Sequence, residues 1–166
     1  MKKFRYPKKR LSIALLAVLL TASSFSFQPG SASASWNKAL GRYAWASSGS
    51  SPANGVDGVP NTFWQPSGGG QGWLTVDLGS SQSVQQIVLK SPAYGHWVEA
   101  VSVLTSDSAD DGSFAAQTSG TYAFYSANSY TVTIQLPNAV NARYVRVNVA
   151  PVSTATTIGE LEVYGP

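Results

Sequence analysis

A loop rich in glycine and proline carries oxygen-bearing side chains that could hold a cation. Asp57 lies in this loop, and Thr62 follows it five residues later. Calcium takes about six to eight oxygen ligands, which carboxylates, hydroxyls and loop carbonyls supply. The alternative is that Asp57 only caps its own turn. We expect a structural cation that ties this loop to the rest of the domain.

A second group of candidate residues combines aromatic rings, an imidazole and a carboxyl. These residues are Tyr94, His96, Trp97, Glu99, Phe124 and Tyr125. Sugars present apolar C–H faces, which lie against aromatic rings, and hydroxyls, which meet polar groups. We therefore expect a sugar-binding face here. The alternatives are that Trp97 begins a strand and packs inward, and that His96 is a surface residue without a ligand.

Residues suited to catalysis are few. Glycoside hydrolysis usually needs two carboxyls about 5–9.5 Å apart across a cleft. Glu160 and Glu162 share a strand face and could lie within that range, but both project from one strand rather than from two sides of a cleft. The chain has one histidine and no cysteine, and it contains no G-x-S-x-G turn. The glycine-rich run 67–72 lacks the lysine that a phosphate loop needs. We therefore expect no enzymatic activity.

The N-terminal segment predicts export. A basic segment 1–10 precedes an apolar run 11–20, and Ala32-Ser33-Ala34 supplies a small-residue cleavage pattern. This order is typical of a secretory signal peptide, here 1–34, followed by one domain, 35–166. A membrane anchor is the alternative, but it needs about 20 apolar residues. We expect a secreted, extracellular protein, and the absence of cysteine favours a bacterial source.

The charge distribution excludes two classes of partner. Six of the eleven basic residues lie in the first ten positions, whereas all eight acidic residues lie beyond residue 50. The predicted mature domain is therefore net acidic. A nucleic-acid-binding surface requires clustered basic residues, and anionic lipid also attracts basic segments. We expect neither nucleic acid nor membrane lipid as a partner.

Apolar and polar residues alternate with a period of two, which predicts an all-β fold. The alternation is clear at 74–78, 130–136, 145–149 and 161–163, and further strands are expected near 42–47, 84–90, 98–106 and 114–125. Turns are expected at Gly79-Ser80, Asp111-Gly112 and Pro137-Asn138. Eight strands at this spacing favour an antiparallel sandwich. Its core is expected to hold Trp64, Trp73, Tyr130 and Tyr144.

Five fragments stand in a recognisable order: NKALG (37–41) with AWASS (44–48), ANGVDG (53–58) with NTFW (61–64), WLTVDLG (73–79), ARYVRV (142–147) and GELEVYG (159–165). With these fragments in this order, the chain resembles the discoidin domain, also called the coagulation factor V/VIII C-type domain, nearly from end to end of its predicted mature part. The resemblance implies an eight-stranded antiparallel jelly-roll sandwich of the galactose-binding-domain-like type. Bacterial members are often carbohydrate-binding modules attached to secreted glycanases.

The resemblance also implies a set of calcium ligands. By position these are the side chains of Asp57, Thr62 and Glu160 and the carbonyls of Asn54 and Val59. The family usually has Asn or Asp where Val59 stands, so this chain offers only a carbonyl there.

The sugar residues of galactose-binding relatives are not retained. Gln65 stands where those relatives have His, His96 where they have Arg, and Phe124 near their Asn. We therefore expect a neutral polysaccharide, such as an α-glucan, rather than galactose.

The expected function is that of a secreted, lectin-like module. Such a module would act alone, with a secreted glycanase, or as an oligomer that multiplies weak contacts. The alternative is a cell-surface adhesion or protein-interaction domain whose loop aromatics meet a protein.

Overall fold

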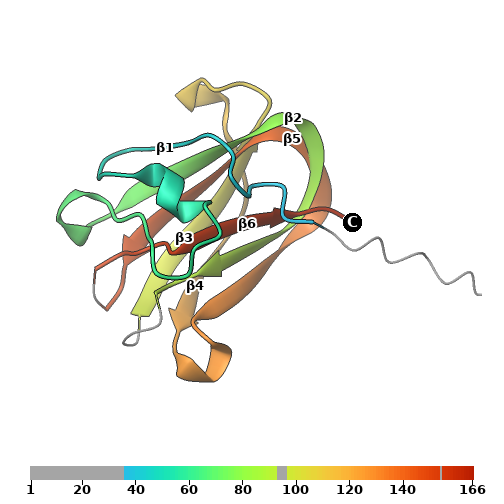
Figure 1. Cartoon of the computed structure of the whole chain (residues 1–166). Helices are drawn as coiled ribbons and strands as arrows, with labels where there is room; N and C mark the ends of the chain where they lie inside the picture. Colours follow the sequence, from blue (N-terminus) through green and yellow to red (C-terminus); the bar gives the residue numbers. More distant parts are fainter. Residues whose placement is uncertain (1–35, 93–96, 154) are drawn as a thin grey trace, which may run out of the picture. The chain divides into compact units, whose positions relative to one another are not determined.

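The computed structural model describes residues 36–92, 97–153 and 155–166. Its strands are β1 (Ala44–Ala46), β2 (Gly72–Lys90), β3 (Trp97–Ser106), β4 (Ala115–Phe124), β5 (Thr131–Pro151) and β6 (Glu160–Tyr164) (Figure 1). Short 3-10 turns join them: η1 (Pro52–Gly55), η2 (Ser67–Gly69), η3 (Asp111–Ser113) and η4 (Ser126–Asn128). The signal peptide expected at 1–34 lies outside the described residues. Within the described ranges, no helix is long and apolar enough to cross a membrane.

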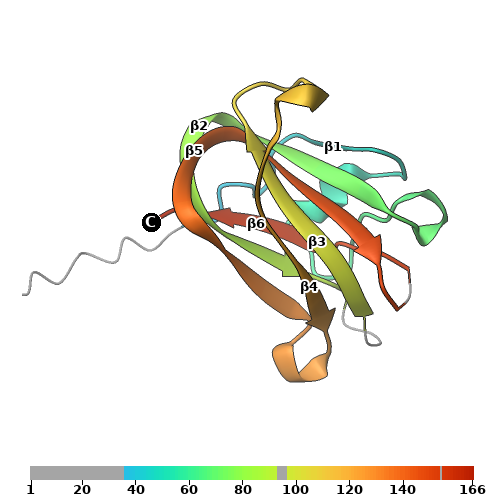
Figure 2. The same cartoon turned by 180° about the vertical axis from the view of Figure 1, so that it is seen from behind.

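The two longest strands each run through both layers of a sandwich. The first half of β2 pairs with β1 and with the end of β5, and its second half pairs with β6 and with the start of β5. β3 and β4 extend the first layer beyond β5. Figure 2 shows β2 and β5 curving together from one layer to the other. The six antiparallel strands thus supply the expected eight segments, which confirms the predicted fold.

Two predicted turns prove to be bends inside continuous strands. Gly79-Ser80 lies within β2 and Pro137-Asn138 within β5. Gly79 has a φ of 88°, a backbone conformation that favours glycine, and the β2–β5 register shifts between Asp77 and Gln82. A bulge of this kind bends a strand without ending it. The third predicted turn, Asp111-Gly112, is confirmed as part of η3.

The inward faces of the strands form the core. Leu74, Val76 and Leu78 are fully buried, as their period-two spacing predicts. Trp64 is also fully buried, and its indole N–H donates to the Ser48 carbonyl at 2.9 Å. Trp64 and Ile158 exchange backbone hydrogen bonds of 2.8 and 2.9 Å. This pairing fixes the loop before Trp64 against the segment that leads into β6.

The predicted core position of Trp73 is wrong. Trp73 is only half-buried, and it alternates with the inward Leu74, so its side chain lies on the outer face of the first layer. Tyr144 lies on that same face, because it pairs with Asp77, and it is buried by its neighbours Trp45 and Arg143. Tyr130 is half-buried and precedes β5.

Candidate functional site

The first candidate site lies in the loop that the Trp64–Ile158 pairing holds near β6. The Asp57 carboxylate accepts the Val59 N–H at 2.8 Å, which is the turn-capping contact considered above. The Thr62 hydroxyl lies 2.9 Å from both Asp57 carboxyl oxygens and 2.9 Å from the Val59 carbonyl oxygen. The Asn54 side chain donates to the Phe63 carbonyl at 3.2 Å. These contacts bring the oxygen atoms of the loop close to one another.

Glu160, the first residue of β6, adds a second carboxyl to this site. Its side chain is only 4% exposed, and neither carboxyl oxygen forms a hydrogen bond within the described part of the chain. Burial, together with the nearby Asp57 carboxyl, raises the pKa of Glu160 to about 7. The buried Glu160 carboxyl therefore lies beside the half-buried Asp57 carboxyl, and neither has a positively charged partner among the described residues.

The possible metal ligands in this cluster are all oxygen atoms. Among the described residues, no three or more His, Cys, Asp or Glu side chains gather as a metal site. A cation here would therefore draw on two carboxylates together with hydroxyl and carbonyl oxygens, which suits calcium better than a transition metal.

The second candidate site is a pair of hollows at the loop end of the sandwich. One hollow of about 480 Å³ is lined by Gly49, Ser50, Phe63, Gln65, Pro66, Ser67 and Gly68. The other, of about 420 Å³, is lined by Gly68, Gly69, Pro151, Val152, Ser153 and Ala155. Gly68 belongs to both, so the hollows are adjacent, and no charged side chain of the described residues lines either of them.

Gln65 is the predicted sugar contact that the structure places at this end. Its side chain is half-buried and its amide lies 3.4 Å from the Thr157 hydroxyl. Gly49 has a φ of 84°, and a Cβ there would lie within 2.0 Å of the Gln65 carbonyl oxygen, so glycine permits this close approach. Phe63, which the sequence analysis did not select, lines the same hollow and is 36% exposed.

The predicted aromatic face is only partly present. Trp97 is half-buried against the core, and Phe124, its cross-strand partner, is 1% exposed. The predicted sugar contact by Phe124 is therefore corrected, because its ring belongs to the core. Tyr125 is 41% exposed. Tyr94 and His96 lie outside the described residues, so their roles stay predictions.

Glu99 is likewise corrected from a sugar contact to a buried group. It lies on the same face of β3 as the inward residues Val101 and Val103, and it is 1% exposed. One carboxyl oxygen accepts the Thr157 N–H at 3.1 Å, and the other has no partner among the described residues. Burial raises the pKa of Glu99 to about 7, and the Thr157 N–H opposes this rise.

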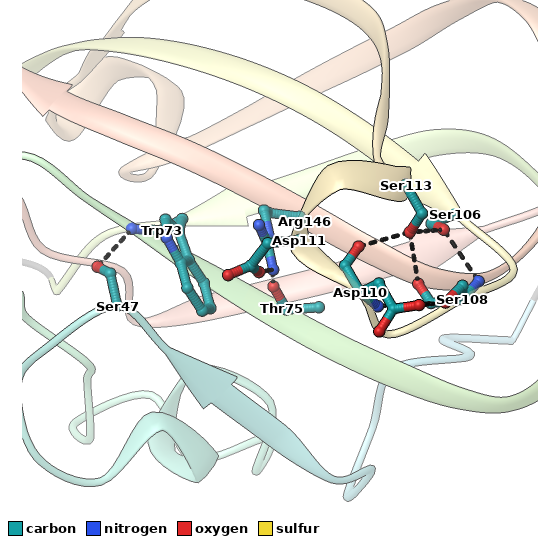
Figure 3. A network of polar contacts seen from close by, with 9 residues as sticks. All are labelled: Ser47, Trp73, Thr75, Ser106, Ser108, Asp110, Asp111, Ser113 and Arg146. Atoms are coloured by element: carbon teal, nitrogen blue, oxygen red, sulfur yellow. Dashed lines mark hydrogen bonds and ion pairs between the residues drawn. The ribbon is translucent and has the colours of Figure 1, made fainter.

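A polar cluster on the outer face of the first layer centres on Arg146 (Figure 3). Its guanidinium lies 3.9 Å from the ring centroids of both Trp73 and Phe114. It donates to the Thr75 hydroxyl at 2.8 Å and to the Asp111 carboxylate at 2.7 Å. Arg146 is 6% exposed, so its contacts with the two rings and with Thr75 are shielded from water and fix the Trp73 ring in place, whereas its partner Asp111 is exposed.

Replacing this arginine is expected to destabilise the protein. Arg146→Ala should lower the free energy of unfolding by about 3 kcal/mol, because it removes two cation–π contacts and two charged hydrogen bonds. Urea denaturation measures the change. The control is Arg143→Ala, which removes a more exposed guanidinium and its ion pair with Asp77 and should cause a clearly smaller loss. Equal losses in the two variants would contradict this account of Arg146.

The architecture is thus an antiparallel β-sandwich with an oxygen-rich loop and neutral hollows at its loop end. A family model for the F5/8 type C domain matches residues 30–162, and the chain belongs to this family. No curated protein sequence matches the chain.

Solved structures with a similar fold come from bacterial carbohydrate-active proteins. The chitosan-binding module 1 of a Paenibacillus sp. IK-5 chitosanase/glucanase is 26% identical, with a TM-score of 0.61 over 78% of this chain and 99% of that chain. The family 32 carbohydrate-binding module of C. perfringens NanJ, in complex with galactose, is 20% identical, with a TM-score of 0.63 and coverage of 78% and 97%.

A larger enzyme shares the fold in one part. A Ruminococcus gnavus GH29 fucosidase in complex with fucose is 19% identical, with a TM-score of 0.64 over 78% of this chain. The chain spans about a quarter of that enzyme, 26% of its length.

Proposed function

We propose that the protein is a secreted, non-catalytic carbohydrate-binding protein. The observation that carries this proposal is the likeness to binding modules along nearly their whole length, with 99% coverage of the chitosan-binding module. Export is supported by the order of charge, apolar run and small residues in 1–34. The absence of a catalytic role is supported by the burial of Glu160 and by the 2.6 Å ion pair between Glu162 and Lys90, because neither carboxyl is left free to act on a substrate across a cleft.

The proposed ligand is a neutral polysaccharide, such as an α-glucan, held at the loop-end hollows. The neutral lining of both hollows supports an uncharged ligand. The exposed part of the Phe63 ring offers an apolar surface for a sugar face, and the Gln65 amide offers hydrogen bonds to hydroxyls. Tyr94 and His96, which shortly precede β3 in the sequence, are proposed to complete the site.

We further propose that a structural calcium ion binds Asp57, Thr62 and Glu160, with carbonyl ligands from Asn54 and Val59. The unpartnered Glu160 carboxyl beside Asp57 supports this, because a divalent cation would supply the positive charge that the two carboxylates lack. The Thr62 hydroxyl and the Val59 carbonyl already lie within 2.9 Å of each other. The bound ion would join the first loop to the last strand.

A substitution at the loop end tests the sugar site. Phe63→Ala is expected to weaken binding to soluble starch by about tenfold, the change that corresponds to about 1.4 kcal/mol, because it removes the proposed ring contact. Retardation in gels with and without starch measures the binding. The control is Tyr43→Ala, which removes a ring that is 72% exposed but outside both hollows. Starch binding by Phe63→Ala equal to that of the control would contradict the loop-end site.

A further inference from the structure

A third hollow, a groove of about 630 Å³, lies on the outer face of the first layer. It runs over β2, β5, β3 and β4, the strands that Figure 2 shows side by side. It shares no lining residue with either loop-end hollow. Its volume falls within the range of about 300–1,000 Å³ that is typical of ligand sites.

The strand register arranges a row of side chains across this groove. Trp73 pairs with Asn148, Asn148 pairs with Ser102, and Ser102 pairs with Ser119. Paired residues of antiparallel strands lie on the same face, and neighbouring strands are about 4.8 Å apart. An aromatic ring is thus followed by one amide and two hydroxyls, spaced regularly across four strands.

The next row of side chains on the same face makes the groove deeper. Ala100 pairs with Ala150 on one side and with Thr121 on the other. Because two of these three side chains are only methyl groups, the floor of the groove is low beside the polar row. Thr121, which is exposed, adds another hydroxyl at the edge.

The polar groups of the row are available to a ligand. Asn148 and Ser119 are exposed and Ser102 is half-buried. Within the part of the chain that the structure describes, none of these three side chains forms a hydrogen bond to the protein. Among the residues that the structure describes, no charged side chain lines the groove, so it suits an uncharged partner that is rich in hydrogen-bonding groups.

The aromatic end of the row is held rigidly. The Trp73 ring stacks on the Arg146 guanidinium at 3.9 Å, and its backbone N–H donates to the Ser47 hydroxyl at 3.0 Å (Figure 3). A ring whose orientation is already fixed loses little conformational freedom when a ligand binds. The ring therefore provides a preformed apolar surface beside the amide and hydroxyls.

We propose that this groove is a second glycan-binding site, which takes an extended, uncharged segment of several sugars across the strands. This inference rests on the proposed function and deepens it. A polysaccharide that occupied both the groove and the loop end would bind more tightly than either site allows alone, because the second contact is intramolecular.

The test compares variants at the two sites for binding to soluble starch and to maltose. Ser102→Arg places a long side chain in the groove, and the milder Asn148→Ala removes one exposed amide. Each is expected to weaken starch binding, Ser102→Arg by at least tenfold, while binding of the short sugar maltose at the loop end stays unchanged. Thr133→Arg, an exposed position of β5 in the other layer, is the matched control.

The outcomes separate the inference from the proposed function. Additive losses in Ser102→Arg and Phe63→Ala would support two sites. If both groove variants bind starch like the wild-type protein and Phe63→Ala does not, the groove is not a glycan site and the proposed function stands. If the wild-type protein binds neither starch nor maltose, cellulose or chitin, both proposals are overturned.

Discussion

Calcium is expected to raise the melting temperature of the protein by about 10 °C over its value in excess chelator. A ligand at about 100 times its Kd stabilises the folded state by about 2.7 kcal/mol when it binds only that state. For a domain of this size, each kcal/mol moves the melting temperature by about 3–5 °C. Differential scanning calorimetry with calcium and with chelator measures the shift.

The response of one variant distinguishes the proposed ligands from a general salt effect. Glu160→Gln is expected to abolish the calcium shift, because it removes a carboxylate from the site. In chelator the same variant should melt higher than the wild-type protein, because it removes the charge of a buried carboxyl that lies beside the half-buried Asp57 carboxyl. Magnesium at equal ionic strength is the control for salt. Identical melts with calcium and with chelator would remove calcium from this account.

The second large effect concerns pH and the buried carboxyl of Glu99. Burial raises its pKa from the ordinary value of 4.5 to about 7. Below pH 4.5 the group is protonated in both states and costs nothing. Between pH 4.5 and 7 the unfolded state loses its proton first, so stability falls as the pH rises. The full loss above pH 7 is about 3 kcal/mol, at about 1.4 kcal/mol for each unit of pKa shift.

Glu99→Gln is expected to remove this part of the pH dependence. At pH 8 the variant should be about 1–3 kcal/mol more stable than the wild-type protein, and at pH 4 the two should be similar. Urea denaturation between pH 4 and pH 8, at constant calcium, measures the difference. Asp110→Asn, at an exposed position, serves as the control. A constant difference between Glu99→Gln and wild type at every pH would contradict the assigned ionisation.

The sequence was sufficient for the fold because alternation of apolar and polar residues is a local signal. Every predicted strand is present, and the inward side chains of β2 follow the spacing of Leu74, Val76 and Leu78. The two strands that pass from one layer to the other were less predictable. Gly79 and Pro137 are residues typical of turns, yet here they permit a bend while pairing continues on both sides.

Glu99 and Phe124 were selected for the predicted sugar face by residue type, although both lie in the strands expected at 98–106 and 114–125, where alternation and pairing decide which side chains face the core. Glu99 shares its parity with Val101 and Val103, and this alternation predicts that it faces inward. Phe124 ends β4, and its burial follows from pairing with Trp97, a contact between strands that local sequence cannot supply.

The alternation of neighbouring residues also explains the positions of Trp73 and Phe63, which were not predicted from the sequence. Trp73 precedes the inward Leu74, so parity places it outside, where Arg146 covers one ring face. Phe63 likewise precedes the buried Trp64 and faces the loop-end hollow. The groove row of Asn148, Ser102 and Ser119 depends on strand register, which is a property of the folded sheet rather than of any one segment.

Co-sedimentation with insoluble polysaccharides tests the central claim most directly. The protein, loaded with calcium, is mixed with amylose-type α-glucan, cellulose, chitin and vesicles of anionic lipid, and the reducing ends released are measured in parallel. We expect the protein to sediment with the α-glucan, to remain in solution with the vesicles, and to release no reducing ends. Failure to sediment with any of the polysaccharides, or a steady release of reducing ends, would contradict a non-catalytic glycan-binding role.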